Sequence, residues 1–445
     1  MDMREQFFSY TGFALSEGDR AALKMPVGTT LVATQAENCR CARGALKRCL
    51  GLEYIYDPYG RALNTKLKPK RIRMLYYNVD LDRQYYAALI GEDNWLYGYD
   101  VPSRTFQQLS VKPGVECCLC PLPDGTGEPD FYVLTNDEVN RVNGGLTLAH
   151  SDQEWNNRAA CVFRDRFFYS AGRAVVFSEA GDFDDFSSSA YGGGSVEVLD
   201  GLGNVLQLLV YQNSILLFKE NSIFRLEGAG AADGFRLERL PYYGRKIVRN
   251  SAALCGRYVL FMTDSGDIFR MDGNRFERLV EGVPAELCFD DVGVASDGER
   301  YFLSNGERIL VFEAEDGSRH ELYPLRGITS TDGVAVGEWN QYICRIVPNG
   351  FLPKNVQPRF FAEGVAVKDG KEKWVKRLLV YGEGTVRVAF GSGGRTVEGE
   401  LILSDKGSEL PVDVKGKAFD WEIQFLDNGC VRKIDVEFSE MEGGK

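Results

Sequence analysis

A chain of 445 residues that is 44% hydrophobic and 26% charged has an ordinary globular composition and is long enough for two or three domains. The formal net charge of −12 argues against a protein that grips the nucleic-acid backbone, because such proteins are usually basic. The 49 glycines and the 12% share of aromatic residues favour many short strands and tight turns over helices, which indicates an all-β fold.

The N-terminal region, residues 1–70, does not share the pattern of the residues that follow and reads as an extended arm. Residues 51–57 alternate apolar and polar side chains and end in the turn signal DPYG, which predicts a strand. The basic run KLKPKRIR at 66–73 is interpreted as a solvated connector. We expect the strand at 51–57 to join the domain that follows.

From residue 71 the chain repeats one hairpin, formed by an apolar strand, a polar turn and a second apolar strand. The clearest copy is NSILLFKENSIFRLEG at 213–228, in which the turn is KEN. The turns of the related copies lie near residues 92, 137, 172, 220, 265 and 306, about 43 residues apart on average. A period of about 40–50 residues built from short strands is typical of a β-propeller with one four-stranded blade per repeat.

Six blades fit between residues 71 and 325, and the strands at 334–347 supply part of a seventh. A propeller leaves an unpaired strand edge in water unless its last blade is completed. The strand at 51–57 is the natural donor, so we favour seven blades over six. The propeller is assigned to residues 71–353, closed by a strand from the arm at 1–70.

The pattern changes after Pro353, and Pro353 and Pro358 mark a domain boundary. Residues 358–442 contain six to seven strands of alternating polarity, about 12 residues apart, with glycine-containing turns between them. This spacing predicts a small C-terminal antiparallel β-sandwich. Trp374 and Trp421 are expected in its core.

The sequence offers no motif for catalysis or cofactor binding. Its two histidines, His150 and His320, have no cysteine or aspartate partners at metal-ligand spacing, and no phosphate loop or nucleophile elbow occurs. We therefore expect no catalytic residue, no cofactor and no metal site. The protein is predicted not to be an enzyme.

Acidic residues could still support one kind of catalysis, because glycoside hydrolases built on propellers need only two carboxylates. The candidate acids are Asp290 and Asp291 and a group in the loop FSEAGDFDDF at 177–186. That group consists of Glu179, Asp182, Asp184 and Asp185. Acids beside glycine and serine in a turn mostly cap backbone N–H groups, and we interpret these acids in that way.

Residues 164–228 carry a family resemblance. In order, they show a strand that ends in FSEAGDFDDF, a glycine-containing spacer at 192–204, an apolar strand and lysine at 205–219, and SIFRLEG at 222–228. In this order of elements the segment resembles the propeller of phage and prophage tail-structure proteins, which act as tail accessory or portal-to-tail stabilisation proteins.

The resemblance implies a structural component of a phage or prophage particle, assembled in the bacterial cytoplasm and located in the virion. Its partners would be portal, tail or adaptor subunits, and copies of the chain could form a homo-oligomeric ring. Direct contact with nucleic acid or with a membrane is not expected. The longest apolar run, 205–218, is too short and too polar to span a bilayer.

A structural propeller would dock its partners through exposed blade edges, and protein interfaces are enriched in tyrosine and arginine. The segment PYYGRK between two predicted blades has this composition. The candidate residues of the interaction surface are Tyr242, Tyr243, Arg245, Glu179, Asp182, Asp184 and Asp185.

Two other functions remain open on the sequence alone. A carbohydrate-binding or glycoside-hydrolysing propeller would bring aromatic and acidic residues together at one mouth of the central channel. A bacterial protein-interaction scaffold without a role in the virion would have the same sequence pattern as a particle component.

Overall fold

The computed structural model describes most of the chain. The described residues are 6–15, 20–21, 24–42, 44–57, 59–79, 82–100, 102–109, 118–122, 130–134, 139–142, 148–151, 159–187, 192–201, 203–228, 234–289, 292–331, 333–354 and 356–440. The chain divides into two compact units. One contains Met1–Leu52, Leu310–Tyr323 and Val347–Lys445, and the other contains Glu53–Ile309 and Pro324–Ile346.

Seven four-stranded sheets follow one another along the described part of the chain. The first contains β8 (Pro69–Val79), β9 (Asp82–Gly91), β10 (Leu96–Asp100) and β11 (Thr105–Gln108). The second contains β12 (Cys118–Leu122), β13 (Asp130–Leu134), β14 (Val139–Val142) and β15 (Leu148–Ser151). The third contains β16 (Ala160–Phe163), β17 (Arg166–Ala171), β18 (Ala174–Phe177) and β19 (Gly194–Glu197).

The fourth sheet contains β20 (Gln207–Tyr211), β21 (Ser214–Phe218), β22 (Ile223–Glu227) and β23 (Arg236–Arg239). The fifth contains β24 (Ala253–Cys255), β25 (Tyr258–Met262), β26 (Ile268–Asp272) and β27 (Arg275–Val280). The sixth contains β28 (Gly293–Ser296), β29 (Arg300–Ser304), β30 (Ile309–Glu313) and β31 (Arg319–Leu322). The seventh contains β32 (Arg326–Thr331), β33 (Val334–Trp339), β34 (Tyr342–Val347) and β7 (Gly51–Tyr54).

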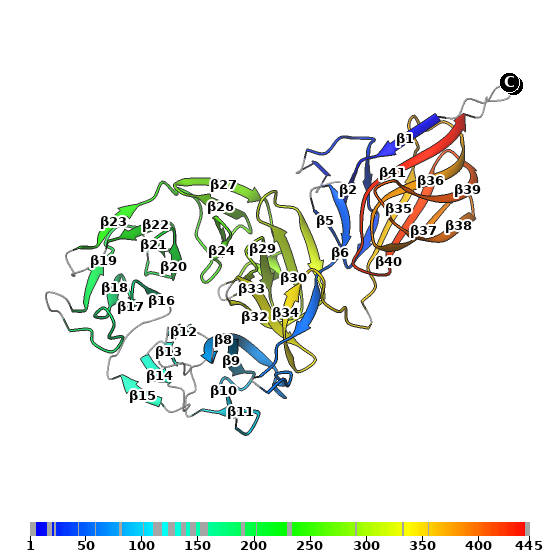
Figure 1. Cartoon of the computed structure of the whole chain (residues 1–445). Helices are drawn as coiled ribbons and strands as arrows, with labels where there is room; N and C mark the ends of the chain where they lie inside the picture. The colour runs from blue at the N-terminus through cyan, green and yellow to red at the C-terminus, as the bar shows by residue number, and fades with distance from the viewer. Residues whose placement is uncertain are drawn as a thin grey trace. The chain divides into compact units, whose positions relative to one another are not determined.

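The inner strands of these sheets close a ring. β8, β12, β16, β20, β24, β28 and β32 each contact the next strand in the series, and β32 contacts β8 (Figure 1). The fold is therefore a seven-bladed β-propeller, which is the count that the spacing of the turns favoured. A short 3-10 helix, η2 (Ala285–Leu287), follows the fifth blade. No helix in the described residues is long and apolar enough to cross a bilayer.

The hydrophobic cores of the propeller lie between neighbouring blades, because each blade packs both of its faces. Between the third and fourth blades, Phe168 and Phe177 meet Ile215 and Leu217 in one buried cluster. β21 and β22 form the hairpin expected at 213–228, with Ile215 opposite Leu226. Each fully buried side chain of this kind contributes about 1.5–3 kcal/mol by leaving water.

The seventh blade takes its outer strand from the N-terminal arm, as the sequence predicts. The backbone groups of Leu52 and Phe351 exchange two hydrogen bonds, of 2.8 and 2.9 Å. Farther along, the Ile55 N–H donates to the Ile343 carbonyl oxygen at 3.0 Å. β7 is the neighbour of β34 in this sheet, so β34 has a partner in place of an edge open to water, and the Leu52–Phe351 bridge lies just beyond its end.

Asp57 fastens the segment after β7 to the first blade. Its Oδ2 accepts a hydrogen bond of 2.9 Å from the Tyr99 hydroxyl group on β10. Its Oδ1 accepts the backbone N–H groups of Tyr59 and Arg61, at 2.9 and 2.8 Å, and so closes the predicted turn. Asp57 is buried, and these three donors satisfy a carboxylate that would otherwise be costly to bury.

Two larger sheets lie in the unit that contains Met1–Leu52 and Val347–Lys445. The six-stranded sheet has β1 (Gln6–Tyr10), β5 (Cys39–Ala42), β6 (Ala45–Arg48), β36 (Lys373–Glu383), β39 (Ser408–Gly416) and β41 (Cys430–Glu440). The five-stranded sheet has β4 (Gln35–Glu37), β35 (Arg359–Val365), β37 (Thr385–Ser392), β38 (Arg395–Ile402) and β40 (Phe419–Phe425). β2 (Gly12–Ala14) and β3 (Thr30–Val32) form a small parallel pair.

Both sheets of this unit contribute to one hydrophobic core, in which Phe390 and Phe438 are members. We expected residues 358–442 to form a unit alone and the arm to give one strand to the propeller. Four strands of the arm, β1, β4, β5 and β6, instead pair within these two sheets. The short N-terminal strands find partners there that their own sequence does not indicate, since β1 pairs with β41 at the far end of the chain.

The two tryptophans expected in the core have different positions. Trp421 is buried in the core and packs edge-on against Phe390. Trp374 is half-buried and out of phase with the core residue Val375, because side chains alternate along β36. Its Nε1 donates to Asp413 Oδ1 at 2.6 Å, so the expectation of a core position was wrong for Trp374.

Substitution of Tyr99 by phenylalanine tests the fastening of the closing segment. The change removes a hydrogen bond to a buried carboxylate, so we expect a loss of about 1.5–3 kcal/mol in the free energy of unfolding. Chemical denaturation of the full-length chain gives this value. Tyr59→Phe is the matched control. Tyr59 is exposed, so this change should alter the free energy of unfolding by no more than about 0.5 kcal/mol. Equal losses in the two variants would contradict the assignment.

Candidate functional site: the central cavity and the pocket at its rim

The acidic loop after β18 makes hydrogen bonds within itself. Asp182 Oδ1 accepts the Asp184 N–H at 3.0 Å, and Asp185 Oδ1 accepts the Ser187 N–H at 2.8 Å. Hydrogen bonds from Ser187 lower the pKa of Asp185 below its ordinary value. The Glu179 N–H donates to the Asp185 carbonyl oxygen at 2.7 Å. Asp182 and Asp185 therefore cap backbone groups of the turn, as the sequence indicated.

Asp184 joins the third blade to the second. Its carboxylate accepts a hydrogen bond from the Tyr132 hydroxyl group on β13 and forms an ion pair with Arg141 on β14. The Tyr132 side chain is buried, whereas the Asp184 side chain remains more than half exposed. The acidic loop is thereby held against the neighbouring blade, a contact that the sequence did not reveal.

Tyr242, expected at the interaction surface, belongs to the core between the fourth and fifth blades. It is 2% exposed, and its ring packs edge-on against Phe261 at a centroid distance of 5.3 Å. Its hydroxyl group donates to the Arg245 carbonyl oxygen at 2.9 Å, and burial raises its pKa. Tyr243 is 83% exposed and Arg245 is also exposed, so only these two of the three residues expected from the segment lie at the surface.

Lys219, in the turn of the clearest hairpin, is buried and holds a neighbouring loop. Its ammonium group donates to the carbonyl oxygens of Val198 and Asp200 at 2.9 and 2.8 Å, and lies 3.4 Å from that of Gly201. Removal from water lowers the pKa of Lys219. No sequence signal predicted this role, because lysine is almost never fully buried.

The inner strands of all seven blades surround a central cavity of about 900 Å³. Most of the residues that line it are apolar or small, such as Val162 and Leu254. Charged side chains gather on one sector, formed by the first, sixth and seventh blades. They are Lys70, Glu92, Glu307 and Arg326.

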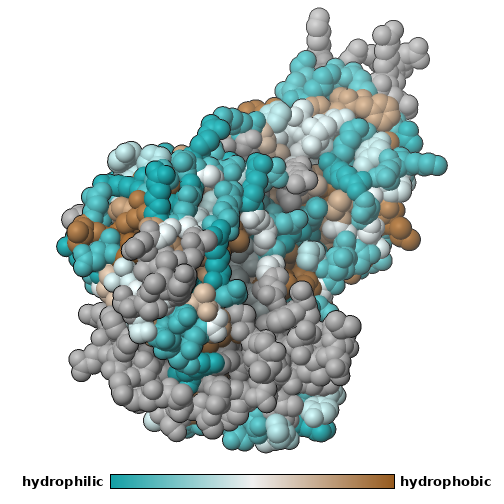
Figure 2. Space-filling view, turned by 60° about the vertical axis from the view of Figure 1, so that its left-hand side comes forward, coloured by the Kyte–Doolittle hydropathy of each residue, from teal (hydrophilic) through white to brown (hydrophobic). Residues whose placement is uncertain are grey.

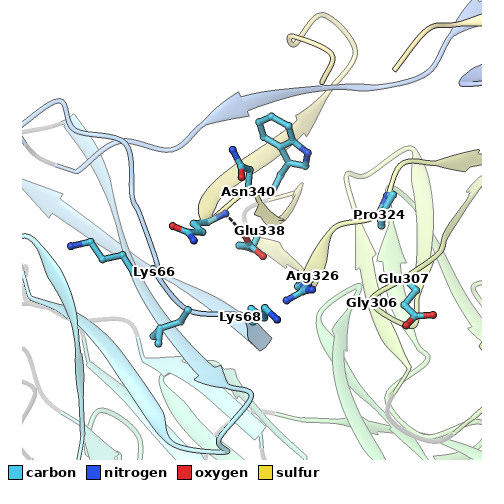
Figure 3. Close-up of a pocket in the computed structure, with 11 residues that line it drawn as sticks. Lys66, Lys68, Gly306, Glu307, Pro324, Arg326, Glu338 and Asn340 are labelled. Carbon is cyan, nitrogen blue, oxygen red and sulfur yellow. Dashed lines mark hydrogen bonds between the residues drawn. The ribbon is translucent and has the colours of Figure 1, made fainter. Parts of the chain in front are cut away.

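A second pocket, of about 560 Å³, lies at the rim of the central cavity and shares Gly306, Glu307 and Arg326 with it. We call it the rim pocket (Figure 3). Four segments line it: residues 66–68 before β8, the turn at 306–307, residues 324 and 326 at the start of β32, and the turn at 338–341. Neither cavity is lined by an acid of the loop at 179–185.

Glu338 lies near the centre of the rim pocket, together with Arg326 and Lys68 (Figure 3). It is 6% exposed, and its Oε1 accepts the backbone N–H of Gln341. Burial raises the pKa of Glu338, against the opposing effects of that N–H group and of Arg326. The carboxylate of Glu92 faces two cations. Its Oε1 lies 3.5 Å from Nη1 of Arg326, and its Oε2 lies 3.9 Å from Nζ of Lys68.

The rim pocket could not be singled out from the sequence. Its residues come from four segments that only the closure of the ring brings together. The basic run at 66–73 was interpreted as a solvated connector, whereas its residues from Pro69 on belong to β8. Among the described residues, no group of three histidine, cysteine, aspartate or glutamate side chains is arranged to hold a metal ion. Asp290 and Asp291 lie outside the described residues.

No family model matches the chain, and a search of curated proteins finds no match. Virginiamycin B lyase from Staphylococcus aureus is structurally similar with a TM-score of 0.47 and 9% identity, over 67% of this chain and 99% of that one. A streptogramin B lyase has a TM-score of 0.44 and 13% identity, over 66% of this chain and 97% of that one. The β-propeller domain of Cps50 (Swd1) from Myceliophteria thermophila has a TM-score of 0.41 and 12% identity, over 62% of this chain and 95% of that one. These likenesses concern the fold alone.

Truncation of the two adjacent tyrosines distinguishes the buried residue from the surface residue. Tyr242→Ala should lower the free energy of unfolding by about 3–5 kcal/mol, the scale for removing a buried aromatic ring. Tyr243→Ala, the matched control, should change it by less than about 0.5 kcal/mol. Urea denaturation of the two variants measures both values. A tolerated Tyr242→Ala substitution would show that this residue does not support the core between the blades.

Proposed function

We propose that this protein is a structural component of a phage or prophage particle, a rigid propeller platform on which portal, tail or adaptor subunits dock, without a catalytic role. The observation that carries this proposal is that the polar motif residues of the segment at 164–228 stabilise the fold. Asp182, Asp184, Asp185 and Lys219 make bonds inside the fold, and none of the four lines the central cavity or the rim pocket.

Bonds of this kind suit a protein whose function is to keep its shape under load. Asp184 couples two blades, and Lys219 fixes the loop at 198–201 against the fourth blade's hairpin. Close packing between blades transmits strain with little deformation. A ring that is closed by its own N-terminal strand presents its loops in fixed positions, as a docking platform requires.

Partners would dock on exposed parts of the blades. Tyr243 and Arg245 are both exposed in the loop after β23, and they have the composition of interface residues. Figure 2 shows apolar residues in small groups among hydrophilic ones on the face that it presents. A mixed surface of this kind is typical of non-obligate protein interfaces. The same surface could join copies of the chain in a homo-oligomeric ring.

The proposal places the protein in the virion, after assembly in the bacterial cytoplasm. The net charge of −12 fits a part that contacts other proteins better than one that contacts DNA. Neither nucleic acid nor a membrane is proposed as a partner. A bacterial scaffold with no virion role would use the same surfaces, and the presence or absence of the protein in particles separates the two.

Particle incorporation tests the proposed function. The chain, tagged at its C-terminus, is expressed in its native host, particles are induced and purified on a density gradient, and their proteins are quantified by mass spectrometry. We expect the protein to sediment with the particles after a salt wash, in a constant ratio to their portal or tail subunits. Recovery only among cytosolic proteins would contradict the proposal and favour the bacterial scaffold.

Two double variants test the docking surface in the same assay. Tyr243→Ala with Arg245→Ala should lower the number of copies per particle by about five-fold, as expected when an interface loses about 1 kcal/mol. Tyr59→Ala with Arg104→Ala is the matched control. Tyr59 is also an exposed tyrosine, and the Arg104 guanidinium lies 5.2 Å from the centre of its ring. Equal incorporation of the two variants would remove Tyr243 and Arg245 from the docking surface.

A further inference from the structure

The rim pocket has the size of a small-ligand site, and hydrogen bonds hold part of its wall in place. Its volume of about 560 Å³ lies within the usual range of about 300–1,000 Å³ for such sites. The turn at 338–341 is tied to the loop before β8, because the Gln341 carbonyl oxygen accepts the Thr65 N–H at 2.7 Å. The Thr65 hydroxyl group in turn donates to the Leu67 carbonyl oxygen at 2.9 Å. Two of the four lining segments are therefore held in place before any ligand arrives.

Two cations of the pocket, Arg326 and Lys68, make long ion pairs with Glu92. The nitrogen–oxygen distances are 3.5 Å for Arg326 and 3.9 Å for Lys68, longer than the 2.7–2.9 Å or so of a strong charge-assisted hydrogen bond. The charge of Arg326 also acts on the buried Glu338. The side chains of Arg326 and Lys68 are 41% and 62% exposed, so a ligand can reach them. A guanidinium group has five N–H donors in a planar fork that matches a carboxylate. These two side chains suit an anionic group on a ligand.

Other residues of the pocket can bind the hydroxyl groups and the apolar face of a ligand. Glu338 accepts the Gln341 N–H through Oε1, and an ionised carboxylate has about four lone-pair sites, so it can also accept from a hydroxyl group. Glu307 and Asn340 add polar groups at the edge of the pocket. Trp339, which also lines the pocket, provides an aromatic surface that can cover the apolar face of a ring.

We propose that the rim pocket binds an acidic sugar, a pyranose ring that carries a carboxylate, such as the uronic acid unit of a bacterial polysaccharide. Its carboxylate pairs with Arg326 and Lys68, and its hydroxyl groups bond to Glu338 and its neighbours. Glu338 and Glu307 repel any anionic group, so a simple anion such as phosphate gains only the pairing with the cations, whereas the hydroxyl groups of an acidic sugar also donate to these carboxylates. A neutral sugar leaves the two cations without a ligand group. The mixed charges of the pocket therefore favour a ligand with both kinds of group.

This inference is independent of the proposed particle role, because binding of a small sugar is measured on the isolated protein. The experiment uses the full-length chain and ligand-observed NMR titrations. The probes are methyl β-glucuronide, methyl β-glucoside and inorganic phosphate. We expect saturation transfer to the ring protons of the glucuronide, and binding at least about ten-fold weaker for the glucoside, which lacks the charged group.

Variants locate the binding. Arg326→Gln should weaken glucuronide binding by about ten-fold or more, and Arg326→Lys by less, because lysine keeps the charge but loses the fork. Arg278→Gln is the matched control, since Arg278 is an exposed arginine on β27, 3.5 Å from Glu281. It should leave the binding unchanged. If Arg326→Gln does not fold, as judged by thermal unfolding, Lys68→Gln replaces it, because Lys68 is exposed.

Four results would overturn the inference. They are no glucuronide binding at millimolar concentration, equal binding of the glucoside, displacement of the glucuronide by equimolar phosphate, and unchanged binding in the folded Arg326 or Lys68 variant. The second result would mean that the carboxylate is not recognised. The third would mean that the pocket is a general anion site. Particle incorporation does not enter any of these readouts.

Discussion

The propeller depends on one hydrogen-bonded junction, where β7 pairs beside β34. Leu52 and Phe351, which exchange two backbone bonds there, are about 300 residues apart, so joining them costs roughly 5 kcal/mol of chain entropy. Burial of the apolar side chains around the junction offsets this cost, at about 1.5–3 kcal/mol for each. The strands approach closely: a side chain at Gly51 would lie 2.3 Å from the Gly350 carbonyl oxygen. Only a glycine fits at this position without a shift of the backbone.

Closure of the ring also assembles the sites. The seventh blade provides Arg326 and Glu338, and the segment between β7 and β8 provides Lys68, so the rim pocket exists only when the N-terminal segment is in place. Asp57, bound to Tyr99, and Thr65, bound to Gln341, hold the same segment on both sides. Rigidity of the platform and formation of the pocket thus have one physical origin. The proposed docking role needs the rigid platform, and sugar binding needs the pocket.

Periodicity allowed the architecture to be predicted, whereas the environment of single residues could not be. The spacing of turns indicated seven blades, and the need to pair a last strand edge pointed to residues 51–57. Tyr242 and Tyr243 are neighbours in one turn, and no local signal tells which of them enters the core between two blades. Lys219 stands in a polar turn but bonds to a loop contributed by another part of the chain. Trp374 is out of phase with the core because of its place in the alternation of β36.

Backbone hydrogen exchange at the junction tests the central claim, that the N-terminal strand closes the ring. The amides of Leu52 and Ile55 donate to Phe351 and Ile343. Exchange measured by mass spectrometry on the full-length protein should find these two amides as strongly protected as those of β21, within the fourth blade. Exchange at the rate of exposed loops would contradict this claim, because it would mean that the seventh blade is open in solution.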